Sequence, residues 1–306
     1  EPSMLRRLLL WLSERPRLRL WMETSAGAER LTRRFVAGLT LDQALDVCRR
    51  LNARGILASL DHLGERVSSE AEARASVGDY LRALERISAE NLQATVSIKL
   101  TQFGLDRSEQ LCTENVERLV ESARRLGGMI EIDMESHQYV DSTLRIATSM
   151  HRHYGSVRAV IQAYLYRSRQ DLGALCDLGI PVRLCKGAYR EPPSVAFPKK
   201  KDVNRNYLRL SELLLSRGVY PALATHDPAM INHAISFAAA AGRSNDSFEF
   251  QMLYGIRRDL QEKLASGGFR LRLYVPYGRA WYPYLMRRLA ERPANVFFLL
   301  RNLLRR

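Results

Sequence analysis

Residues 157–188 read VRAVIQAYLYRSRQDLGALCDLGIPVRLCKGA, and their pattern is the clearest indication of the fold. Two short apolar runs, at 157–164 and 180–188, flank a helix-length segment whose apolar residues recur about every 3.6 positions. Short apolar runs that alternate with such segments are typical of buried parallel strands joined by helices. The stretch therefore predicts a strand, a helix and a second strand.

The same alternation extends along most of the chain. Ser108 and Gly127 bound one intervening helix as N-cap and C-cap, and Asp227, Pro228 and Gly242 bound another in the same way. The predicted strands are 56–64, 94–100, 129–135, 157–164, 180–188, 220–226, 247–253 and 270–277. Eight strand–helix repeats over about 240 residues predict a (β/α)8 TIM barrel.

The alternative fold is a doubly wound parallel sheet. That fold favours a glycine-rich turn of the form GxGxxG after a strand, and the sequence contains none. We expect residues 1–50 to form an N-terminal helical arm and residues 51–306 to form the barrel, with a C-terminal helix over its mouth. The leucines and arginines of residues 5–17 suit either an anionic membrane surface or packing on the barrel.

Composition restricts the class of protein. Among the 306 residues 46% are hydrophobic and 26% charged, which is ordinary for a globular chain. No apolar run reaches the roughly 18 residues of a membrane span, so a cytoplasmic location is expected. The net charge of +14 is spread along the chain, with only a short lysine run at 199–201, so no nucleic-acid partner is expected. The four scattered cysteines lack CxxC spacing, and no metal site is expected.

Polar residues end several of the predicted strands. In a (β/α)8 barrel the carboxyl ends of the strands build the active site. One such residue is commonly part of a structural ion pair, but six strands ending in this way indicate a polar pocket. We expect its basic residues to face its acidic ones. The residues are Lys99, Asp133, Glu135, Gln162, Arg183, Lys186, Thr225, His226 and Gln251.

The segment YLMRRLAERPAN, residues 284–295, follows the last strand closely. Tyr284, Arg287, Arg288 and Glu291 are three or four residues apart, so they share one side of a helix. Two guanidinium groups offer paired donors to a carboxylate or phosphate, and Glu291 can hold one of them. The segment predicts a site for a small anionic or zwitterionic ligand at the barrel mouth.

The chain resembles the proline dehydrogenase family over roughly residues 50–305. The motifs that carry the resemblance are SIKL (97–100), EIDME (131–135), VIQAY (160–164), RLCKGAYRE (183–191), ATHD (224–227), EFQMLYGI (249–256) and YLMRRLAERPAN (284–295). The resemblance implies a (β/α)8 barrel that binds FAD non-covalently and oxidises L-proline to Δ1-pyrroline-5-carboxylate, the first step of proline degradation to glutamate.

The family also implies partners. Electrons pass to a membrane quinone, so contact with the inner face of the membrane is expected. The sequence shows neither an aldehyde dehydrogenase module nor a DNA-binding arm and is similar to the monofunctional bacterial type. A separate pyrroline-5-carboxylate dehydrogenase would then take the product.

The resemblance assigns residues to each ligand. Lys99, Arg287 and Arg288 would neutralise the proline carboxylate, and Glu291 belongs to the same site. Tyr274, Tyr284 and Leu253 would line the ring pocket. The expected flavin contacts are Met134, Gln162, Arg183, Lys186, Gly187, Ala188, Thr225 and His226.

Two of the residues carry catalytic roles by the same resemblance. Asp133 is expected to orient Lys99 or the flavin surroundings, because a carboxylate is weakly basic against an amine. Arg183 would lie near flavin N5 and stabilise negative charge there. Arg190 departs from family members that carry an aromatic residue at this position.

Two other classes remain open on the sequence. One is a different flavin barrel that uses NAD(P)H, such as a folate reductase, although the Arg/Glu helix argues against it. The other is a basic, non-enzymatic module that associates with membranes or nucleic acid.

Overall fold

A computed structural model of the chain describes residues 11, 12, 15, 20, 22, 33–64 and 67–291, apart from the side chains of residues 287, 290 and 291. Most of the predicted arm before residue 33 lies outside the described residues. Its last part contains helix α4 (Leu41–Asn52), which begins at a capping box formed by Thr40 and Gln43.

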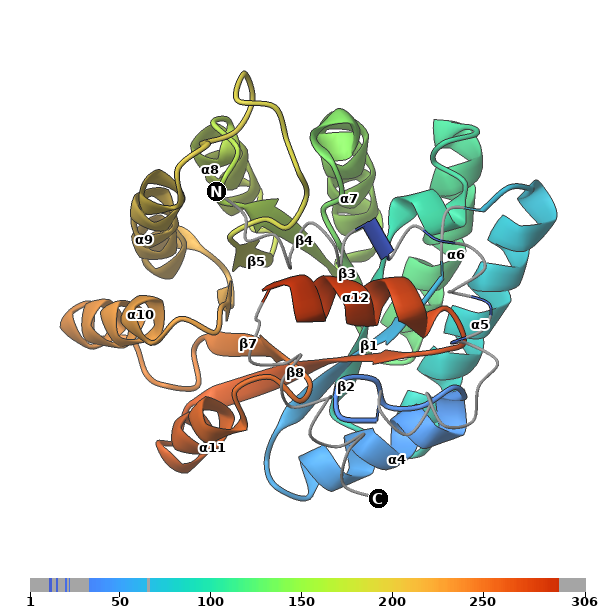
Figure 1. The fold of residues 1–306 in the computed structure, drawn as a ribbon, viewed down its shortest axis with the longest axis horizontal. Helices are drawn as coiled ribbons and strands as arrows, with labels where there is room; N and C mark the ends of the chain where they lie inside the picture. The colour runs from blue at the N-terminus through green and yellow to red at the C-terminus, as the bar shows by residue number, and fades with distance from the viewer. Residues whose placement is uncertain are drawn as a thin grey trace.

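Eight parallel strands close into a barrel in chain order, with β1 hydrogen-bonded to both β2 and β8. Each strand lies inside one of the predicted apolar runs, so the (β/α)8 barrel is confirmed over the doubly wound sheet (Figure 1). The strands are β1 (Leu57–His62), β2 (Ala94–Ile98), β3 (Ile130–Ile132), β4 (Val157–Gln162), β5 (Val182–Cys185), β6 (Ala222–Ala224), β7 (Glu249–Leu253) and β8 (Arg270–Tyr277).

Helices surround the barrel, and two of them begin where the sequence predicted. Ser108 caps α6 by accepting a hydrogen bond from the amide of Leu111, and Asp227 caps α10 through the amide of Ala229. The remaining elements are α5 (Glu70–Ala89), η1 (Leu100–Phe103), α6 (Glu109–Arg125), η2 (His137–Tyr139), α7 (Val140–Tyr154), α8 (Ser168–Asp177), α9 (Lys200–Arg217), α10 (Pro228–Ala240), α11 (Arg258–Ser266) and α12 (Trp281–Glu291).

The two faces of the strands differ in composition. Because side chains alternate along a strand, one set points to the helices and the other into the barrel. The outward set is aliphatic and aromatic and forms the main core with the helices; Leu60, Ile132 and Phe250 are examples. The inward set is polar yet buried, as Ser59 and Glu131 show. The barrel interior is therefore an ionic layer that leads to the mouth.

Helix α12 crosses the barrel mouth, as the sequence predicted (Figure 1). Its Trp281 and Leu285 belong to a separate hydrophobic cluster that includes Phe35 of the segment before α4. Leu12 of the arm packs against the same cluster, and its carbonyl accepts a hydrogen bond from the Tyr282 hydroxyl at 3.1 Å. This part of the arm thus packs against α12.

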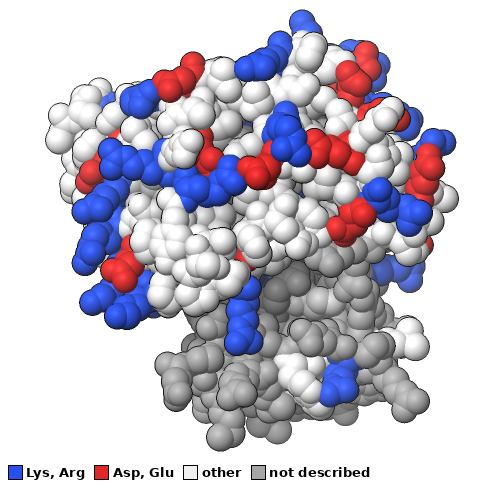
Figure 2. Space-filling view, turned by 90° about the horizontal axis from the view of Figure 1, so that it is seen from above, with Lys and Arg blue, Asp and Glu red and all other residues white. Residues whose placement is uncertain are grey.

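The surface shown in Figure 2 mixes lysine and arginine with aspartate and glutamate. Many of these charges are paired, as in the contacts Arg74–Glu70 and Arg145–Glu109. Across the described residues, no helix combines the length and the apolar character needed to cross a membrane.

Candidate active site

Four side chains meet at the centre of the barrel mouth. Lys99 Nζ lies 2.8 Å from Asp61 Oδ1, 3.0 Å from the Tyr274 hydroxyl and 3.3 Å from Asp133 Oδ2. The Tyr274 hydroxyl donates to Asp133 Oδ2 at 2.7 Å. An ammonium group has three N–H donors, and these three oxygens match them in number. Lys99 therefore joins the ends of β1, β3 and β8.

The protonation states of this group follow from its packing. Burial disfavours the charge of Lys99, but Asp61 and Asp133 outweigh burial and raise its pKa above the usual range. Burial and the nearby Asp133 raise the pKa of Tyr274 well above that of free tyrosine. The ammonium group thus stays charged and the phenol stays protonated at neutral pH.

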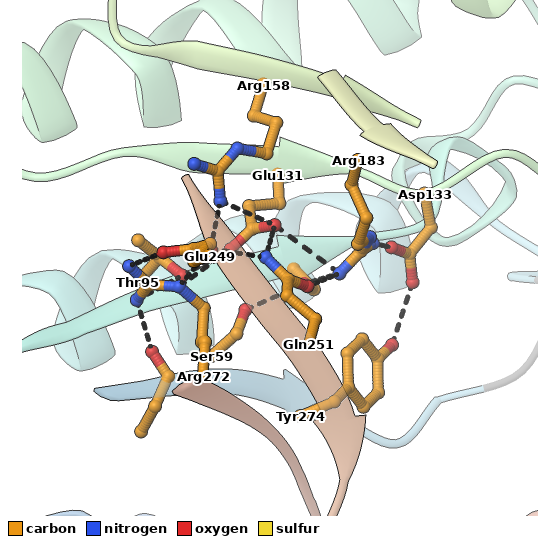
Figure 3. Close-up of polar contacts among 12 residues, drawn as sticks. Ser59, Thr95, Glu131, Asp133, Arg158, Arg183, Glu249, Gln251, Arg272 and Tyr274 are labelled. Carbon is orange, nitrogen blue, oxygen red and sulfur yellow. Dashed lines mark hydrogen bonds and ion pairs between the residues drawn. The ribbon is translucent and has the colours of Figure 1, made fainter. Parts of the chain in front are cut away.

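Arg183 stands beside this group and contacts it through Asp133. Its Nη2 donates to Asp133 Oδ1, and its guanidinium lies 5.5 Å from the Tyr274 ring centroid (Figure 3). From the other side, Nη1 donates to Gln251 Oε1 at 3.1 Å. Only 5% of Arg183 is exposed. Its orientation is therefore set by partners above and below it.

A second ionic layer lies deeper in the barrel (Figure 3). Glu249 accepts hydrogen bonds from Arg158 at 2.7 Å and from Arg272 at 2.8 and 3.0 Å. Glu131 accepts a hydrogen bond from Thr95 at 2.6 Å and lies 3.4 Å from both Arg158 and Arg183. The residues of this layer were not among the site residues predicted from the sequence.

The arginines keep both glutamates of this layer ionised. Burial alone would raise the pKa of each carboxyl group. For Glu131 the attraction of Arg158, Arg183 and Arg272 prevails and holds the pKa well below its usual range. For Glu249 the attraction of Arg272 and Arg158 lowers the pKa to about 2.

Apart from Met134, which follows β3, the residues predicted to contact flavin lie in or just after β4, β5 and β6. The Gln162 amide donates to the carbonyl of Glu135 at 2.9 Å. The Thr225 hydroxyl accepts a hydrogen bond from the amide of Asp227 at 3.1 Å. His226 Nε2 accepts one from the amide of Leu253 at 2.9 Å, which places the proton of a neutral ring on Nδ1. These side chains occupy one half of the mouth.

Lys186 is held by helices rather than by the centre of the mouth. Its Nζ donates to Asn204 of α9 at 2.7 Å and to Asp227, the N-cap of α10, at 2.9 Å. Lys186 was expected to face Asp133 and Glu135. Its contacts with Asn204 and Asp227 show that this expectation is wrong.

Gly187 is required by packing. Its φ is +107°, and a Cβ atom there would collide with the ring of Tyr164. Met134 shares a small hydrophobic cluster with Tyr164, while Ala188 is exposed. Glu191 fixes the same loop: its carboxylate accepts hydrogen bonds from the His137 amide at 2.8 Å and the Tyr164 hydroxyl at 3.2 Å.

Helix α12 carries Tyr284 and Arg288 across the mouth. The guanidinium carbon of Arg288 lies 5.2 Å from the ring centroid of Tyr284, so these two side chains lie together as the helical spacing predicted. Leu253, at the end of β7, packs against the cluster that contains Tyr284. The side chains of Arg287 and Glu291 lie outside the described part of the structure.

Of the three basic residues that Glu135 is expected to face, Lys99 acts on its carboxyl group through its charge, whereas the expectation for Arg183 and Lys186 is wrong. The Glu135 carboxylate accepts hydrogen bonds from the amide of Thr101 at 3.0 Å and from the hydroxyl of the same residue at 2.6 Å. It therefore binds the start of η1 instead of facing Arg183 or Lys186, and burial raises its pKa. Strand β3 ends at Ile132, so the alternation that would place residues 133 and 135 on one face no longer holds.

Asp61 is a site residue that the sequence analysis missed. The signal was present, because an aspartate stands in the first predicted apolar run, near the end of the first strand. Its side chain is 3% exposed and is paired with Lys99. A buried carboxylate at the carboxyl end of a barrel strand belongs to the set of polar strand ends.

The chain is similar in sequence to known proteins. A sequence model of the family described as "Proline dehydrogenase" matches residues 44–301. Proline dehydrogenase 1 of Bacillus subtilis subsp. natto is 40% identical over 303 residues, which cover 99% of this chain and 100% of the relative. Proline dehydrogenase of Deinococcus radiodurans is 40% identical over 311 residues, 98% of each chain.

The solved structures show the same fold. Proline utilization A (PutA) from Bdellovibrio bacteriovorus, inactivated by N-propargylglycine, superposes with a TM-score of 0.82 at 22% identity, over 93% of this chain and 38% of that one. The family predicted from the sequence motifs is confirmed by the two sequence comparisons above. The chain belongs to the proline dehydrogenase family.

Proposed function

We propose that this enzyme oxidises L-proline to Δ1-pyrroline-5-carboxylate, with FAD as the hydride acceptor. The observation that carries the proposal is the set Lys99, Asp133, Arg183 and Tyr274, joined by short contacts at the barrel mouth beneath α12. Balanced buried charges beside an aromatic wall suit a zwitterion with an apolar ring. Family membership supports the same substrate.

Proline would bind between α12 and the barrel mouth. We assign its carboxylate to Arg288 and Arg287, because a guanidinium donates paired hydrogen bonds to a carboxylate. Tyr284, Tyr274 and Leu253 would contact the apolar ring. Glu291 would hold one of the arginines of the same helix.

We assign Lys99 an indirect part in substrate binding. Its three donors are directed at Asp61, Tyr274 and Asp133, so direct contact with the carboxylate would require one of them to move. Asp133 likewise accepts from Arg183, Tyr274 and Lys99, which suits a positioning role better than that of a strong base.

The residues at the ends of β4, β5 and β6 fit FAD. Gln162, Thr225, His226 and the stretch 186–188 offer amide, hydroxyl, imidazole and backbone groups on one half of the mouth. The exposed lysines at 199–201 begin α9 next to this half, and their charge suits a diphosphate. Bound FAD supplies the hydride acceptor, and Arg183 supplies a fixed positive charge at the centre of the mouth.

We further propose that electrons leave to a membrane quinone and that a separate dehydrogenase consumes the product. The arm would then contact the inner face of the membrane. Its Trp11 and Leu20 are exposed, and Arg15 stacks on Trp11 at 3.8 Å, a combination that suits an anionic interface.

The experiment is a product assay with the FAD-loaded protein, L-proline and a soluble quinone analogue. We expect proline-dependent quinone reduction and a cyclic imine product that is two hydrogens lighter than proline. Reduction by NAD(P)H without any response to proline would contradict the proposal and favour a different flavin barrel.

A further inference from the structure

The side-chain amide of Gln251 has one orientation that its partners allow. Its Nε2 donates to Glu131 Oε2 at 3.0 Å and to Glu249 Oε1 at 2.7 Å, so both N–H groups face carboxylates (Figure 3). Its Oε1 accepts from Arg183 Nη1 at 3.1 Å. A flipped amide would turn its oxygen toward two anions and its nitrogen toward a cation. The two glutamates therefore fix the acceptor that Arg183 meets.

Gln251 lies between two layers of charge that are each balanced. The upper layer at the mouth contains Lys99, Arg183, Asp61 and Asp133. The lower layer contains Arg158, Arg272, Glu131 and Glu249. Each has two positive and two negative side chains. Gln251 is 3% exposed and adds a hydrogen-bond acceptor between the layers without adding a charge.

We infer that Gln251 is a positioning residue for Arg183, an inference that rests on the function proposed above. It holds Nη1 from below while Asp133 holds Nη2 from above, and it leaves the positive charge of Arg183 undiminished. A charged acceptor at this place would lie within hydrogen-bonding distance of the guanidinium. It would weaken the positive field at the centre where the hydride acceptor gains negative charge.

The other contacts of Arg183 Nη1 are longer than this hydrogen bond. The Ser97 hydroxyl accepts from Nη1 at 3.4 Å and also shares a hydrogen bond of 2.8 Å with Ser59. Glu131 Oε2 also lies 3.4 Å from Nη1, and it is the nearest anion below. Without the Gln251 oxygen, the guanidinium should turn toward Glu131 and away from its present geometry with Asp133.

Two variants separate the effect of removing the Gln251 amide from the effect of adding a charge at the same place. Gln251→Met keeps the length of the side chain but removes the amide. Gln251→Glu keeps the shape and introduces a group that titrates against Glu131 and Glu249, with Arg183, Arg158 and Arg272 around it. Asn115→Asp is the matched control, because it makes the same amide-to-acid change at a buried residue of α6. The Asn115 amide donates only to the carbonyl of Phe103, at 3.1 Å.

The measurements are flavin affinity, the midpoint potential of bound flavin, and kcat and KM for proline. Each is made at several values between about pH 6 and about pH 9. For Gln251→Met we expect kcat to fall about tenfold with KM changed less than about threefold, since Arg183 moves while the α12 contacts remain.

For Gln251→Glu the effect should depend on pH. While the introduced carboxyl group is protonated, it can donate to one glutamate and accept from Arg183, much as the amide does. Loss of that proton as pH rises adds one negative charge beside Arg183. The midpoint potential of the bound flavin should then fall more steeply with pH than in the wild type. Each tenfold loss in the equilibrium constant for two-electron reduction of the flavin corresponds to a fall of about 30 mV.

Each outcome decides the inference. A shifted potential and a kcat loss in both Gln251 variants, absent from Asn115→Asp, would support it. Unchanged potentials and an unchanged ratio of kcat to KM, with only thermal stability reduced, would overturn it and leave Gln251 a structural residue. Failure of the proposed function is distinct, because the wild-type protein would then bind no flavin or leave proline unoxidised.

Discussion

Lys99 and Asp61 form an ion pair of 2.8 Å between β2 and β1, and this pair sets the role of the lysine. The Asp61 side chain is 3% exposed, whereas that of Lys99 is 26% exposed. Because Asp133 is a second carboxylate at 3.3 Å, the lysine charge is already balanced before substrate arrives. On the function proposed above, the charge of the proline carboxylate would then be balanced by the arginines of α12.

Removing the buried partner of Lys99 should destabilise the protein. We expect Asp61→Asn to lower the free energy of unfolding by about 1–3 kcal/mol, because a partly buried ammonium loses one of two counter-ions. Asp42→Asn is the control: that aspartate is 73% exposed in its pair with Arg86, and its change should stay within about 0.5 kcal/mol. Denaturant titration measures both, and equal effects would contradict the account.

The Tyr274 hydroxyl should matter for turnover. Tyr274→Phe removes the hydrogen bonds to Asp133 and Lys99, and we expect kcat/KM for proline to fall about 10–100-fold. Tyr154→Phe makes the same change at a hydroxyl that donates to Glu117 at 2.8 Å, away from the mouth. Steady-state assays of both should show a loss only for Tyr274. A wild-type kcat/KM in Tyr274→Phe would remove the hydroxyl from the site.

Arg288 should contribute to proline binding and not to flavin binding. We expect Arg288→Met to raise the KM for proline about 10–100-fold, the loss of about 1.5–3 kcal/mol from one charge-assisted contact. Flavin absorbance per protein should stay unchanged. Arg279→Met, an exposed arginine just before α12, is the control and should leave KM as it is. Loss of flavin with an unaltered KM would exclude Arg288 as the carboxylate ligand.

Because of the lower ionic layer, the free energy of unfolding should fall at acidic pH. The pKa of Glu249 is about 2 in the folded protein, below the roughly 4.3 of an unfolded glutamate. Its contribution is therefore present above pH 4.3 or so and is lost as pH falls toward 2.

Glu249→Gln tests that contribution. It should lower the free energy of unfolding by about 3–5 kcal/mol at pH 7, because Glu131 is then the carboxylate that remains beside Arg158 and Arg272. It should also flatten the fall in the free energy of unfolding between about pH 5 and 2.5. Chemical denaturation at several pH values gives both quantities. A variant whose acid profile runs parallel to that of the wild type would show that Glu249 is not ionised in the fold.

The barrel could be predicted from the sequence because its strands are short apolar runs separated by helices with recognisable caps. Ser108 and Asp227 begin helices as expected, since local hydrogen bonds decide a cap. Partners within the site could not be predicted in the same way. Lys99 and Tyr274 are 175 residues apart and meet only because the barrel closes.

Two errors in the expected site have physical causes. Glu135 follows Asp133 by two residues, but the chain leaves the strand at Ile132 and turns the glutamate to Thr101. The lower layer was missed although charged residues such as Arg158 and Glu249 stand within apolar strands, where burial requires a partner. Charge at alternate positions of several strands was the available signal for a polar barrel interior.

The most direct test of the account is an anaerobic titration of the purified, FAD-loaded protein with L-proline, followed by visible absorbance. We predict that proline bleaches the flavin band in proportion to the enzyme present and that a quinone analogue restores it. A protein that binds no FAD, or whose flavin band is unaffected by proline but is bleached by NAD(P)H, would contradict the assignment.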